Sequence, residues 1–340
     1  MTILYLYAEL MGYQIPVFKE YVEQYKAKVH VVHWDKNKLT PYQPPKIDDV
    51  FYYARSKYEH IALEELVSEI KPDIVYVSGW MDKGYLRICK ILKLRGIPIV
   101  AGSDTQVKKT LKQKLGVIYF KLFLKKYFSY IWVAGPYQYE YARKLGFTKN
   151  EIIFNCLSAD ITLFSLQSPK KIVPKKFIFV GRLEQIKGVE ILLDAWKAIS
   201  DKKDSTLTFV GNGSLKNTIL SRNIEVIDFL PPEKLSILLK NYGILILPSL
   251  EEPWALVIQE AMASGLPVIA SNLCGAAPVF ITNNFNGFLI NPNNIEELKN
   301  KINYIINLEE EKLVDLAKNA LEKSTVITPK LVAASFISVI

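Results

Sequence analysis

The sequence predicts an α/β protein made of two doubly wound domains, and three observations lead to this prediction. The chain has 340 residues, which is enough for two hydrophobic cores. Half of its residues are hydrophobic and 23% are charged, as in ordinary globular proteins. Short apolar runs alternate with helical patterns in both halves of the chain. Strands that are buried on both faces and separated by helices form parallel βαβ units, and two such series predict two domains.

The expected strands and helices follow one another in two series. The first series has apolar runs, predicted to be strands, at residues 2–7, 29–33, 74–77, 97–101, 130–134 and 152–155. Helical patterns between these runs include residues 14–25, 60–69 and 84–95. The second series has strands at 177–180, 205–210, 224–229, 244–248, 267–270 and 287–290, and helices at 189–199, 215–221, 232–241, 256–264 and 295–308.

This order of elements predicts the domain boundaries. We expect domains at residues 1–165 and 166–325, joined by the polar, proline-containing segment 165–176. Residues 326–340 are expected to return to the first domain as a last helix. Ligands of doubly wound domains bind beyond the carboxyl ends of the strands, so the expected site is the cleft between the two domains.

Composition narrows the classes of protein. Cys89, Cys156 and Cys274 are scattered and odd in number, which argues against a disulfide framework or a zinc site and favours a reducing cytoplasm. The first residues, MTILYLYAELMGYQ, lack the basic start and cleavage site of a signal peptide. No apolar run approaches the roughly 18 residues of a membrane-spanning helix. The formal net charge of +9 predicts an anionic partner: nucleic acid, acidic lipid or a phosphorylated substrate.

The first candidate constellation follows the strand predicted at 177–180. Gly181 permits a tight turn, Arg182 follows at once, and Lys187 with Gly188 opens a helix. A helix N-terminus flanked by two cations suits a diphosphate, because its dipole and free N–H groups favour an anion. The alternative is that Arg182 and Lys187 are solvated loop residues. Gly211, in the turn after the next strand, is a weaker signal, since glycine turns often follow strands.

The second constellation is a pair of glutamates, Glu252 and Glu260, at a strand-to-helix junction. Ionised carboxylates only accept hydrogen bonds, and vicinal hydroxyls are natural donors. With Glu252 in a loop and Glu260 about one turn into a helix, both can line one extended ligand, and the loop amides between them can meet phosphate. The alternative makes Glu252 an acid favoured by the helix dipole and Glu260 an exposed helix residue.

In order and spacing, these motifs resemble those of the retaining GT-B glycosyltransferases of family 4. The matching motifs are Gly181-Arg182…Lys187-Gly188, Gly211-x-Gly213, Glu252-x7-Glu260-Ala-Met-Ala-x-Gly-x-Pro and Asn286-Gly287-Phe288-Leu289. The resemblance covers about residues 175–300, with a weaker match at residues 160–164. It implies a GT-B fold of two facing Rossmann-like domains, the first for the acceptor and the second for the nucleotide-sugar donor. It also implies catalysis without a metal or cofactor, with a nucleotide-diphosphate sugar as co-substrate.

The resemblance assigns roles to the matching residues. Arg182 and Lys187 would hold the donor diphosphate, and Glu260 would accept from the ribose hydroxyls. Glu252 would hold hydroxyls of the transferred sugar. Backbone contacts to sugar and phosphate would come from Trp254, Ala255, Leu256 and Val257 and from the turns at Gly181 and Gly211. Gly12, after the first strand, would let the first domain approach the diphosphate. The family retains anomeric configuration by same-face attack, so the two glutamates would not form an acid–base pair.

The sequence departs from the family pattern at several places, among them the first loop, which has one glycine where two are common. Trp254 and Ala255 stand where the family usually has a Phe-Gly pair, and Val279 stands where it usually has an acid. Asp104 follows the strand predicted at 97–101, where the family often carries a histidine near the reacting sugar. We expect Asp104 to face the cleft and to position acceptor or sugar. A structural aspartate that caps the following helix fits the sequence equally well.

A basic and aromatic stretch begins at Thr105 and ends at Phe128. It contains seven lysines and no acids, interleaved with leucine and aromatic residues. The pattern predicts one helix, or two helices broken at Gly116, lying on an anionic membrane surface. The alternative is a helix packed on its own sheet with a solvated lysine face. No nucleic-acid recognition module is apparent, so nucleic acid is not expected as a partner.

These observations predict an enzyme. We expect a retaining, metal-independent hexosyltransferase that moves a sugar from a nucleotide-diphosphate donor to a glycan or lipid-linked acceptor. The expected setting is cell-surface polysaccharide or glycolipid synthesis, on the inner face of the cytoplasmic membrane. One alternative is a GT-B sugar-nucleotide epimerase, which would need no acceptor. Another is a catalytically degenerate scaffold that binds a nucleotide sugar, which Val279 and Asp104 keep open.

Overall fold

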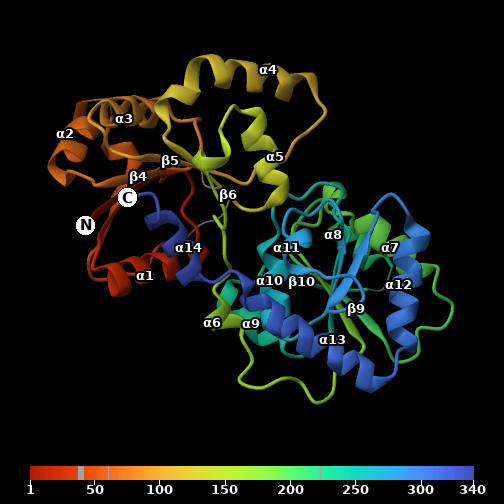
Figure 1. The fold of residues 1–340 in the computed structure, drawn as a ribbon. Helices are drawn as coiled ribbons and strands as arrows, with labels where there is room; N and C mark the ends of the chain where they lie inside the picture. The colour runs from red at the N-terminus through yellow and green to blue at the C-terminus, as the bar shows by residue number, and fades with distance from the viewer. Residues whose placement is uncertain (37–41, 60, 223) are drawn as a thin grey trace. The chain divides into compact units, whose positions relative to one another are not determined.

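The computed structural model describes residues 1–36, 42–59, 61–222 and 224–340, and its ribbon is drawn in Figure 1. The chain divides into two compact units. The first unit comprises Met1–Ser158 and Pro329–Ile340, and the second comprises Ala159–Thr328. The chain therefore passes between the units twice, after Ser158 and after Thr328. Each unit has a parallel sheet of its own, as the alternating pattern predicts.

The first unit is built on a seven-stranded sheet in the order β3-β2-β1-β4-β5-β6-β7. Its strands are β1 Thr2–Tyr7, β2 Lys28–His33, β3 Val50–Ala54, β4 Ile74–Val77, β5 Ile99–Ser103, β6 Tyr130–Val133 and β7 Ile152–Ile153. Its helices are α1 Ile15–Tyr25, α2 Ile61–Ile70, α3 Lys83–Leu94, α4 Leu111–Tyr119, α5 Pro136–Lys144 and α14 Pro329–Ile337. Figure 1 shows α1 and α14 on one side of this sheet and α2 and α3 on the other.

Two differences from the sequence prediction lie in the first unit. The edge strand β3 was not predicted, because its side chains from Phe51 onward are only partly buried and its apolar signal is weak. The strand predicted at 97–101 lies two residues later, so Asp104 directly follows β5. His60, the first residue of the helix predicted at 60–69, lies outside the described residues, and α2 covers the rest of that prediction.

The C-terminal helix α14 completes the core of the first unit. Phe336 is fully buried, and its ring centroid lies 5.2 Å from that of Trp132 and 5.7 Å from those of Tyr5 and Tyr21. Burial of aromatic side chains of this size is a dominant stabilising term in a small core. The segment 329–340 therefore belongs physically to the sheet formed by the start of the chain.

The second unit is built on a six-stranded sheet in the order β10-β9-β8-β11-β12-β13. Its strands are β8 Lys176–Val180, β9 Thr206–Val210, β10 Glu225–Ile227, β11 Ile244–Leu247, β12 Val268–Ser271 and β13 Gly287–Ile290. Its helices are α6 Ile161–Phe164, α7 Val189–Lys197, α8 Lys216–Leu220, α9 Pro232–Leu239, α10 Leu256–Ala263, α11 Ala277–Phe280, α12 Ile295–Asn307 and α13 Glu310–Lys323. Within this unit α7 packs with α12, and α10 packs with α6 and α13.

Both sheets contain a point at which the strand order reverses. In the first sheet β1 lies between β2 and β4, and in the second β8 lies between β9 and β11. Ligands of open α/β sheets bind outside the carboxyl ends of the strands at such a point. In the second unit, the loops that follow β8 and β11 are therefore the expected place for a ligand. The described helices include none with the length and hydrophobicity needed to cross a bilayer.

Candidate active site

The loops after β8, β9 and β11 approach one another so closely that only glycine fits at their contacts. Gly188 has φ +73°, and a Cβ atom there would lie 2.1 Å from the carbonyl oxygen of Pro248. A Cβ atom at Gly211, with φ +141°, would lie 2.0 Å from the carbonyl oxygen of Gly181. Larger residues would force these backbones apart. The glycines singled out in the sequence thus hold three strand-end loops together at the reversal point of the sheet.

Lys187 and Glu252 form an ion pair across two of these loops. The Lys187 Nζ atom donates to Glu252 Oε2 at 2.6 Å, and the two side chains are only 11% and 14% exposed. Lys187 ends the short 3₁₀ turn Gln185–Lys187 after β8, whereas Glu252 lies in the loop after β11. The resemblance assigned these residues to different parts of one donor. In the structure each instead neutralises the charge of the other.

The loop that carries Glu252 is also tied to the loop after β12. Gly275 N donates to Glu252 O at 3.0 Å, and Ala276 N donates to Trp254 O at 2.9 Å. Residues Glu252 and Cys274 form an isolated parallel β-bridge. These bonds extend the sheet by a few residues beyond the ends of β11 and β12. The sequence prediction missed this link, because irregular loop segments carry no apolar periodicity.

Two helices begin at this site without a side-chain cap. Helix α7 starts after Gly188 and α10 starts after Ala255, and neither cap residue makes a side-chain hydrogen bond. The first turn of a helix leaves backbone N–H groups without intrahelical partners. Together with the dipole, these groups favour an anion. The backbone at Leu256 and Val257, predicted to touch the ligand, forms the first turn of α10.

Glu260 projects from the second turn of α10 and is half-buried. Burial raises the pKa of the Glu260 carboxyl from 4.5 to about 7. The group is therefore close to half-ionised at neutral pH, and a partner that donates hydrogen bonds to its carboxylate form would complete its ionisation. Ribose hydroxyls have the chemistry that this carboxylate requires.

The departures at Trp254 and Ala255 have structural consequences. Ala255 adopts a left-handed conformation with φ 82° and ψ 73°, which non-glycine residues rarely adopt. Trp254 is 3% exposed, and its ring centroid lies 6.2 Å from that of Phe280 in an edge-to-face arrangement. A glycine at position 255 would adopt the same backbone without strain. The tryptophan packs under this turn and is not open to solvent.

Ala255→Gly should therefore stabilise the second unit. Left-handed alanine costs roughly 1–2 kcal/mol, and the greater entropy of unfolded glycine offsets part of the relief, so we expect a gain of about 0.5–1 kcal/mol. Urea unfolding measures this difference. Ala198, an exposed residue at the end of α7 with φ −72°, supplies the matched control. Ala198→Gly should destabilise the protein, and equal effects of the two substitutions would refute strain at Ala255.

Three further site residues were predicted. Arg182 lies in the second unit apart from the Lys187–Glu252 ion pair, and Gly12 and Asp104 lie in the first unit. Arg182 follows β8, is exposed, and makes no ion pair with any described residue. Gly12 lies in the turn after β1, where a Cβ atom would be 3.4 Å from the ring of Tyr42. Asp104 follows β5, and Gln138 Nε2 donates to its carbonyl oxygen at 3.2 Å. The next helix is capped by Thr110, which accepts from Gln113 N, so the helix-cap alternative for Asp104 is wrong.

Sequence reasoning also missed Glu184, which fastens the loops after β8 and β9. Ser214 N donates to Glu184 Oε1 at 3.0 Å, and Ser214 Oγ donates to Glu184 Oε2 at 2.6 Å. These hydrogen bonds lower the pKa of the Glu184 carboxyl. The position of an acid two residues after Arg182 gave no signal of its own, because its partner lies in another loop.

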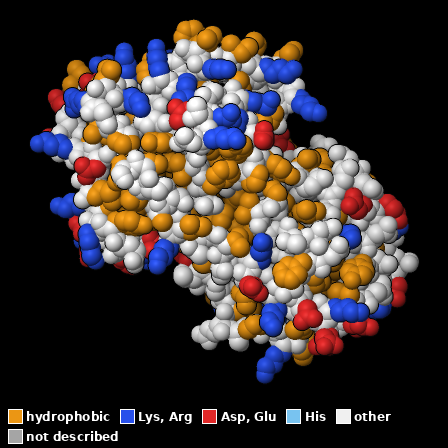
Figure 2. Space-filling model, viewed as in Figure 1, with side chains coloured by type: hydrophobic (Ala, Val, Ile, Leu, Met, Phe, Trp, Pro, Cys, Tyr) orange, Lys and Arg blue, Asp and Glu red, His pale blue; other side chains and the backbone are white. Residues whose placement is uncertain are grey.

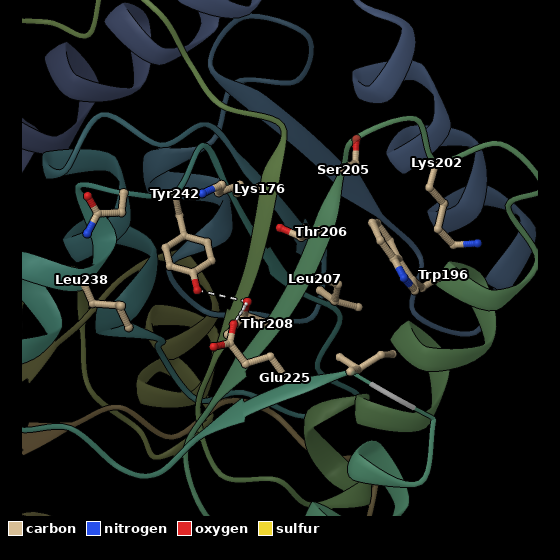
Figure 3. A pocket seen from close by; sticks show the side chains of 12 residues that line it. Lys176, Trp196, Lys202, Ser205, Thr206, Leu207, Thr208, Glu225, Leu238 and Tyr242 are labelled. Carbon is tan, nitrogen blue, oxygen red and sulfur yellow. Dashed lines mark hydrogen bonds between the residues drawn. The ribbon is translucent and has the colours of Figure 1, made fainter.

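A cavity of about 550 Å³ lies in the second unit, but at the opposite end of the sheet. Figure 3 shows its lining, which includes the first residues of β8, β9 and β10. Thr208 Oγ1 donates to Glu225 Oε2 at 2.8 Å and accepts from Tyr242 Oη at 3.0 Å. Ligands of such sheets bind beyond the carboxyl ends of the strands, so this cavity is not the candidate active site. Among the described residues, no group of three or more His, Cys, Asp or Glu side chains is placed to hold a metal ion.

Comparison with known proteins shows what the second unit is similar to. Residues 162–323, nearly all of that unit, match the family model of glycosyl transferases group 1. A glycosyltransferase of Haemophilus influenzae, named as uncharacterized, is 27% identical over 76% of this chain and 78% of its own length. An uncharacterized glycosyltransferase of Methanocaldococcus jannaschii is 34% identical over 39% of this chain and 38% of its own. The sequence is thus similar to glycosyltransferases, with the matching family model confined to the second unit.

Solved structures confirm the predicted fold class. Sucrose-phosphate synthase from Thermosynechococcus elongatus matches with a TM-score of 0.75 at 18% identity, covering 100% of this chain and 98% of that one. The Anabaena protein Alr3699/HepE, in complex with UDP, matches with a TM-score of 0.75 at 18% identity over 100% of both chains. With its two parallel-sheet Rossmann-like domains, the chain has the α/β architecture of the GT-B class.

Proposed function

We propose that the protein is a glycosyltransferase that binds a nucleotide-diphosphate sugar in its second unit. The observation that carries this proposal is the group of charges at the reversal point of the second sheet. Lys187 and Glu252 pair between the uncapped N-termini of α7 and α10, and Glu260 lies one turn further along α10. Cation and helix termini suit a diphosphate, and carboxylates on either side of it suit hydroxyl groups. One extended ligand with an anionic middle and polyol ends satisfies all of these groups.

The proposed chemistry follows from these charges. Bond breakage at the sugar leaves negative charge on the diphosphate, and Lys187, Arg182 and the helix termini would stabilise it. Binding the donor would draw Lys187 toward phosphate and free Glu252 to accept from sugar hydroxyls. We propose a metal-independent transfer of a hexose with retention of configuration, in which the leaving diphosphate accepts the proton of the acceptor. Asp104 and Gly12 are proposed to position acceptor and diphosphate from the first unit.

The acceptor is proposed to be a glycan or a lipid-linked glycan. In support, an Escherichia coli relative is named UDP-Gal:alpha-D-GlcNAc-diphosphoundecaprenol alpha-1,3-galactosyltransferase. It is 33% identical over 43% of this chain and 40% of its own length. The experiment that tests transfer is incubation with nucleotide sugars and isolated membrane lipids, followed by product analysis. Labelled lipid supports the proposal, whereas an altered free sugar formed without acceptor would identify an epimerase.

Donor affinity should fall as the pH drops through about 7. Burial raises the pKa of Glu260 to about 7, and protonation turns one of the two accepting oxygens into a donor and removes the negative charge that strengthens hydrogen bonds from hydroxyls. We expect UDP-glucose to bind about tenfold more weakly at each pH unit below 7, as linkage to a single proton requires. Isothermal titration measures this, and the donor is a suitable probe because its diphosphate does not titrate in this range. Glu260→Gln should bind weakly at every pH.

The raised pKa of Glu260 also predicts how the free energy of unfolding changes with pH. The raised pKa means that the folded protein binds the proton of Glu260 more tightly than the unfolded chain does. The free energy of unfolding is therefore highest below the usual glutamate pKa of 4.5, and it falls as the pH rises through about 7. Glu260→Gln should therefore gain up to about 3 kcal/mol relative to wild type above pH 7. The two proteins should differ little near pH 4.5. An equal difference at both pH values would contradict the assignment.

Helix α4 is the proposed membrane-binding surface, peripheral to the inner face of the cytoplasmic membrane. It contains no buried residue, and Leu111 and Leu115 are 77% and 67% exposed. The helix is not broken at Gly116 and continues into the π-helical turn Phe120–Leu124. Figure 2 shows hydrophobic and basic side chains along the upper edge, where Figure 1 places α4. Val117 is partly buried and packs against the core of the first unit, but Ile118 and Tyr119 are 56% and 57% exposed, so the alternative of a helix packed by its apolar side on the sheet describes little of α4.

The proposed surface is smaller than the basic stretch in the sequence. Lys125 Nζ lies 2.8 Å from Glu151 Oε1 and 4.4 Å from the ring centre of Phe147, so this lysine is turned toward the protein. Phe120 and Leu124 are likewise buried in the core of the first unit. These contacts anchor the C-terminal end of the stretch. The exposed surface therefore consists of α4, the preceding Lys108 and Lys109, and the following Leu122 and Phe123, which are 67% and 51% exposed.

Leu115→Glu should abolish flotation with anionic vesicles. Wild-type protein should float with phosphatidylglycerol-containing vesicles at low salt and less so at high salt, because lysines contribute about 1 kcal/mol each at such a surface. A glutamate among the exposed apolar side chains of α4 would weaken both the hydrophobic and the electrostatic attraction to an anionic membrane. Leu94→Glu is the matched control, since Leu94 is 81% exposed at the end of α3, outside the basic stretch. Flotation that is independent of acidic lipid, or equally lost in both variants, would refute the assignment.

A further inference from the structure

Gln259 is a fully buried polar residue whose amide is completely engaged. It follows Ile258 on α10 and immediately precedes Glu260. Its Oε1 atom accepts from Ala159 N at 2.7 Å. Its Nε2 atom donates to Ser324 O at 2.9 Å and to Ile327 O at 2.6 Å. A buried amide with three short backbone partners has one orientation only, since any rotation would leave buried groups unpaired.

The three partners of Gln259 lie at the two ends of the second unit. Ala159 is the first residue of this unit, and Ile327 precedes its last residue, Thr328. The chain enters the unit at the first of these points and leaves it at the other. One side chain therefore fastens both connecting segments to the same helix. Hydrophobic packing could fill this space, but it would not fix the two segments to within hydrogen-bonding distance.

Helix α10 carries both Gln259 and Glu260, and so joins the hydrogen bonds of Gln259 to the candidate donor site. Ser264 Oγ donates to Phe164 O at 3.2 Å, and Leu166 N donates to Ala263 O at 3.2 Å. The C-terminal end of α10 is thus tied to the segment that follows Ala159, while Glu260 lies next to Gln259. A helix of this length moves as a rigid element, so a shift of either connecting segment moves Glu260 as well.

We infer that Gln259 is a positioning residue that couples nucleotide binding at Glu260 to the two segments connecting the units. This inference rests on the proposed function, because it takes Glu260 as the group that meets the ribose. Binding at Glu260 restrains α10, and through Gln259 it restrains Ala159 and residues 324–328. The coupling is reciprocal, so fixing the connecting segments raises nucleotide affinity by the same factor.

Amide hydrogen exchange of the whole wild-type chain, with and without UDP, tests the coupling directly. UDP should slow exchange at Ala159 and in residues 324–328 as well as in α10. The amides of β9 and β10, next to the cavity of Figure 3, should not change and serve as the internal reference. If UDP binds but exchange does not slow at both connecting segments, the inference is overturned and the proposed function stands. Failure of the wild type to bind UDP overturns the proposed nucleotide and the inference together.

Gln259→Leu gives the second arm of the test. This variant keeps the volume and removes all three hydrogen bonds, so UDP affinity should fall about tenfold, within the usual range of coupling. The protection of Ala159 and residues 324–328 by UDP should be lost. Tyr242→Phe is the matched control, because it removes one buried hydrogen bond at the far end of the same sheet. It should leave UDP affinity and the exchange pattern unchanged.

The two arms separate coupling from a purely structural role. A purely structural Gln259 would lower stability in the Leu variant but keep the UDP-dependent difference in exchange, and that result overturns the inference. A Leu variant that fails to fold leaves the decision to the wild-type exchange measurement, which needs no substitution. Reduced UDP affinity in Gln259→Leu but not in Tyr242→Phe, with protection lost only in the former, is the supporting result.

Discussion

Lys187→Met should abolish donor turnover and also lower the free energy of unfolding by about 3 kcal/mol. The second effect arises because the substitution removes the ammonium group that faces Glu252, whose side chain is only 14% exposed. Removing one partner of a buried ion pair typically costs about 3–5 kcal/mol. Urea unfolding and a donor-hydrolysis assay measure the two effects separately. Loss of activity in this variant therefore cannot by itself be assigned to lost phosphate binding.

The double variant Lys187→Met with Glu252→Gln separates the two effects. It leaves no unpaired charge, so it should recover most of the lost stability, because replacing both members of a buried pair is often nearly neutral. It should remain inactive, since both proposed donor contacts are gone. Lys299→Met is the control, because the Lys299–Glu296 pair lies on the surface of α12 and should contribute less than about 1 kcal/mol. Recovered activity in the double variant would refute the assigned roles.

Phe336→Ala should destabilise the first unit by about 4 kcal/mol. Its ring is fully buried among Tyr5, Tyr21, Tyr76 and Trp132, and removing a core phenylalanine typically costs about 3–5 kcal/mol. Hydrogen exchange should become faster in β1 and α1, while β8 and β11 of the second unit should keep their protection.

The exposed residue Lys330, in the same helix, provides the control for this prediction. Lys330→Ala should change stability by no more than about 0.5 kcal/mol, as is usual for surface substitutions. An equal loss of protection in both units of Phe336→Ala would mean that the units unfold as one. No loss in either unit would mean that α14 does not stabilise the first sheet.

Most of the fold follows from the sequence because buried parallel strands give continuous apolar runs. All six strands predicted in the second series correspond to β8 through β13, within one or two residues at each end. The strand β3 was missed, since an edge strand with partly exposed side chains such as Phe51 lacks that signal. Helices α5 and α13 were also missed. Polar residues outnumber the apolar ones in α13, and α5 carries no long apolar run. Tertiary packing, of α5 against β6 and of α13 against α10, decides their formation.

The site was predictable only as a set of residue types. Spacing placed Lys187 and Glu252 at two strand ends, and the reversal of strand order explains why those ends meet. That the two residues pair with each other was not predictable, because the pairing depends on loop geometry. The link from Glu184 to Ser214 was hidden for the same reason. Gln259 carried no signal at all, since its three partners lie about 65 to 100 residues away along the chain.

The late position of α14 in the chain has a consequence for biosynthesis. Ribosomes add roughly 5–20 residues per second, so the whole second unit is made after β7 and before Phe336 appears. During that interval, on the order of ten seconds or more, the aromatic surface around Tyr5 and Trp132 is covered by α1 but lacks the ring of Phe336. The nascent first unit is then a candidate client for chaperones, and the second unit should be the first to reach its complete native fold.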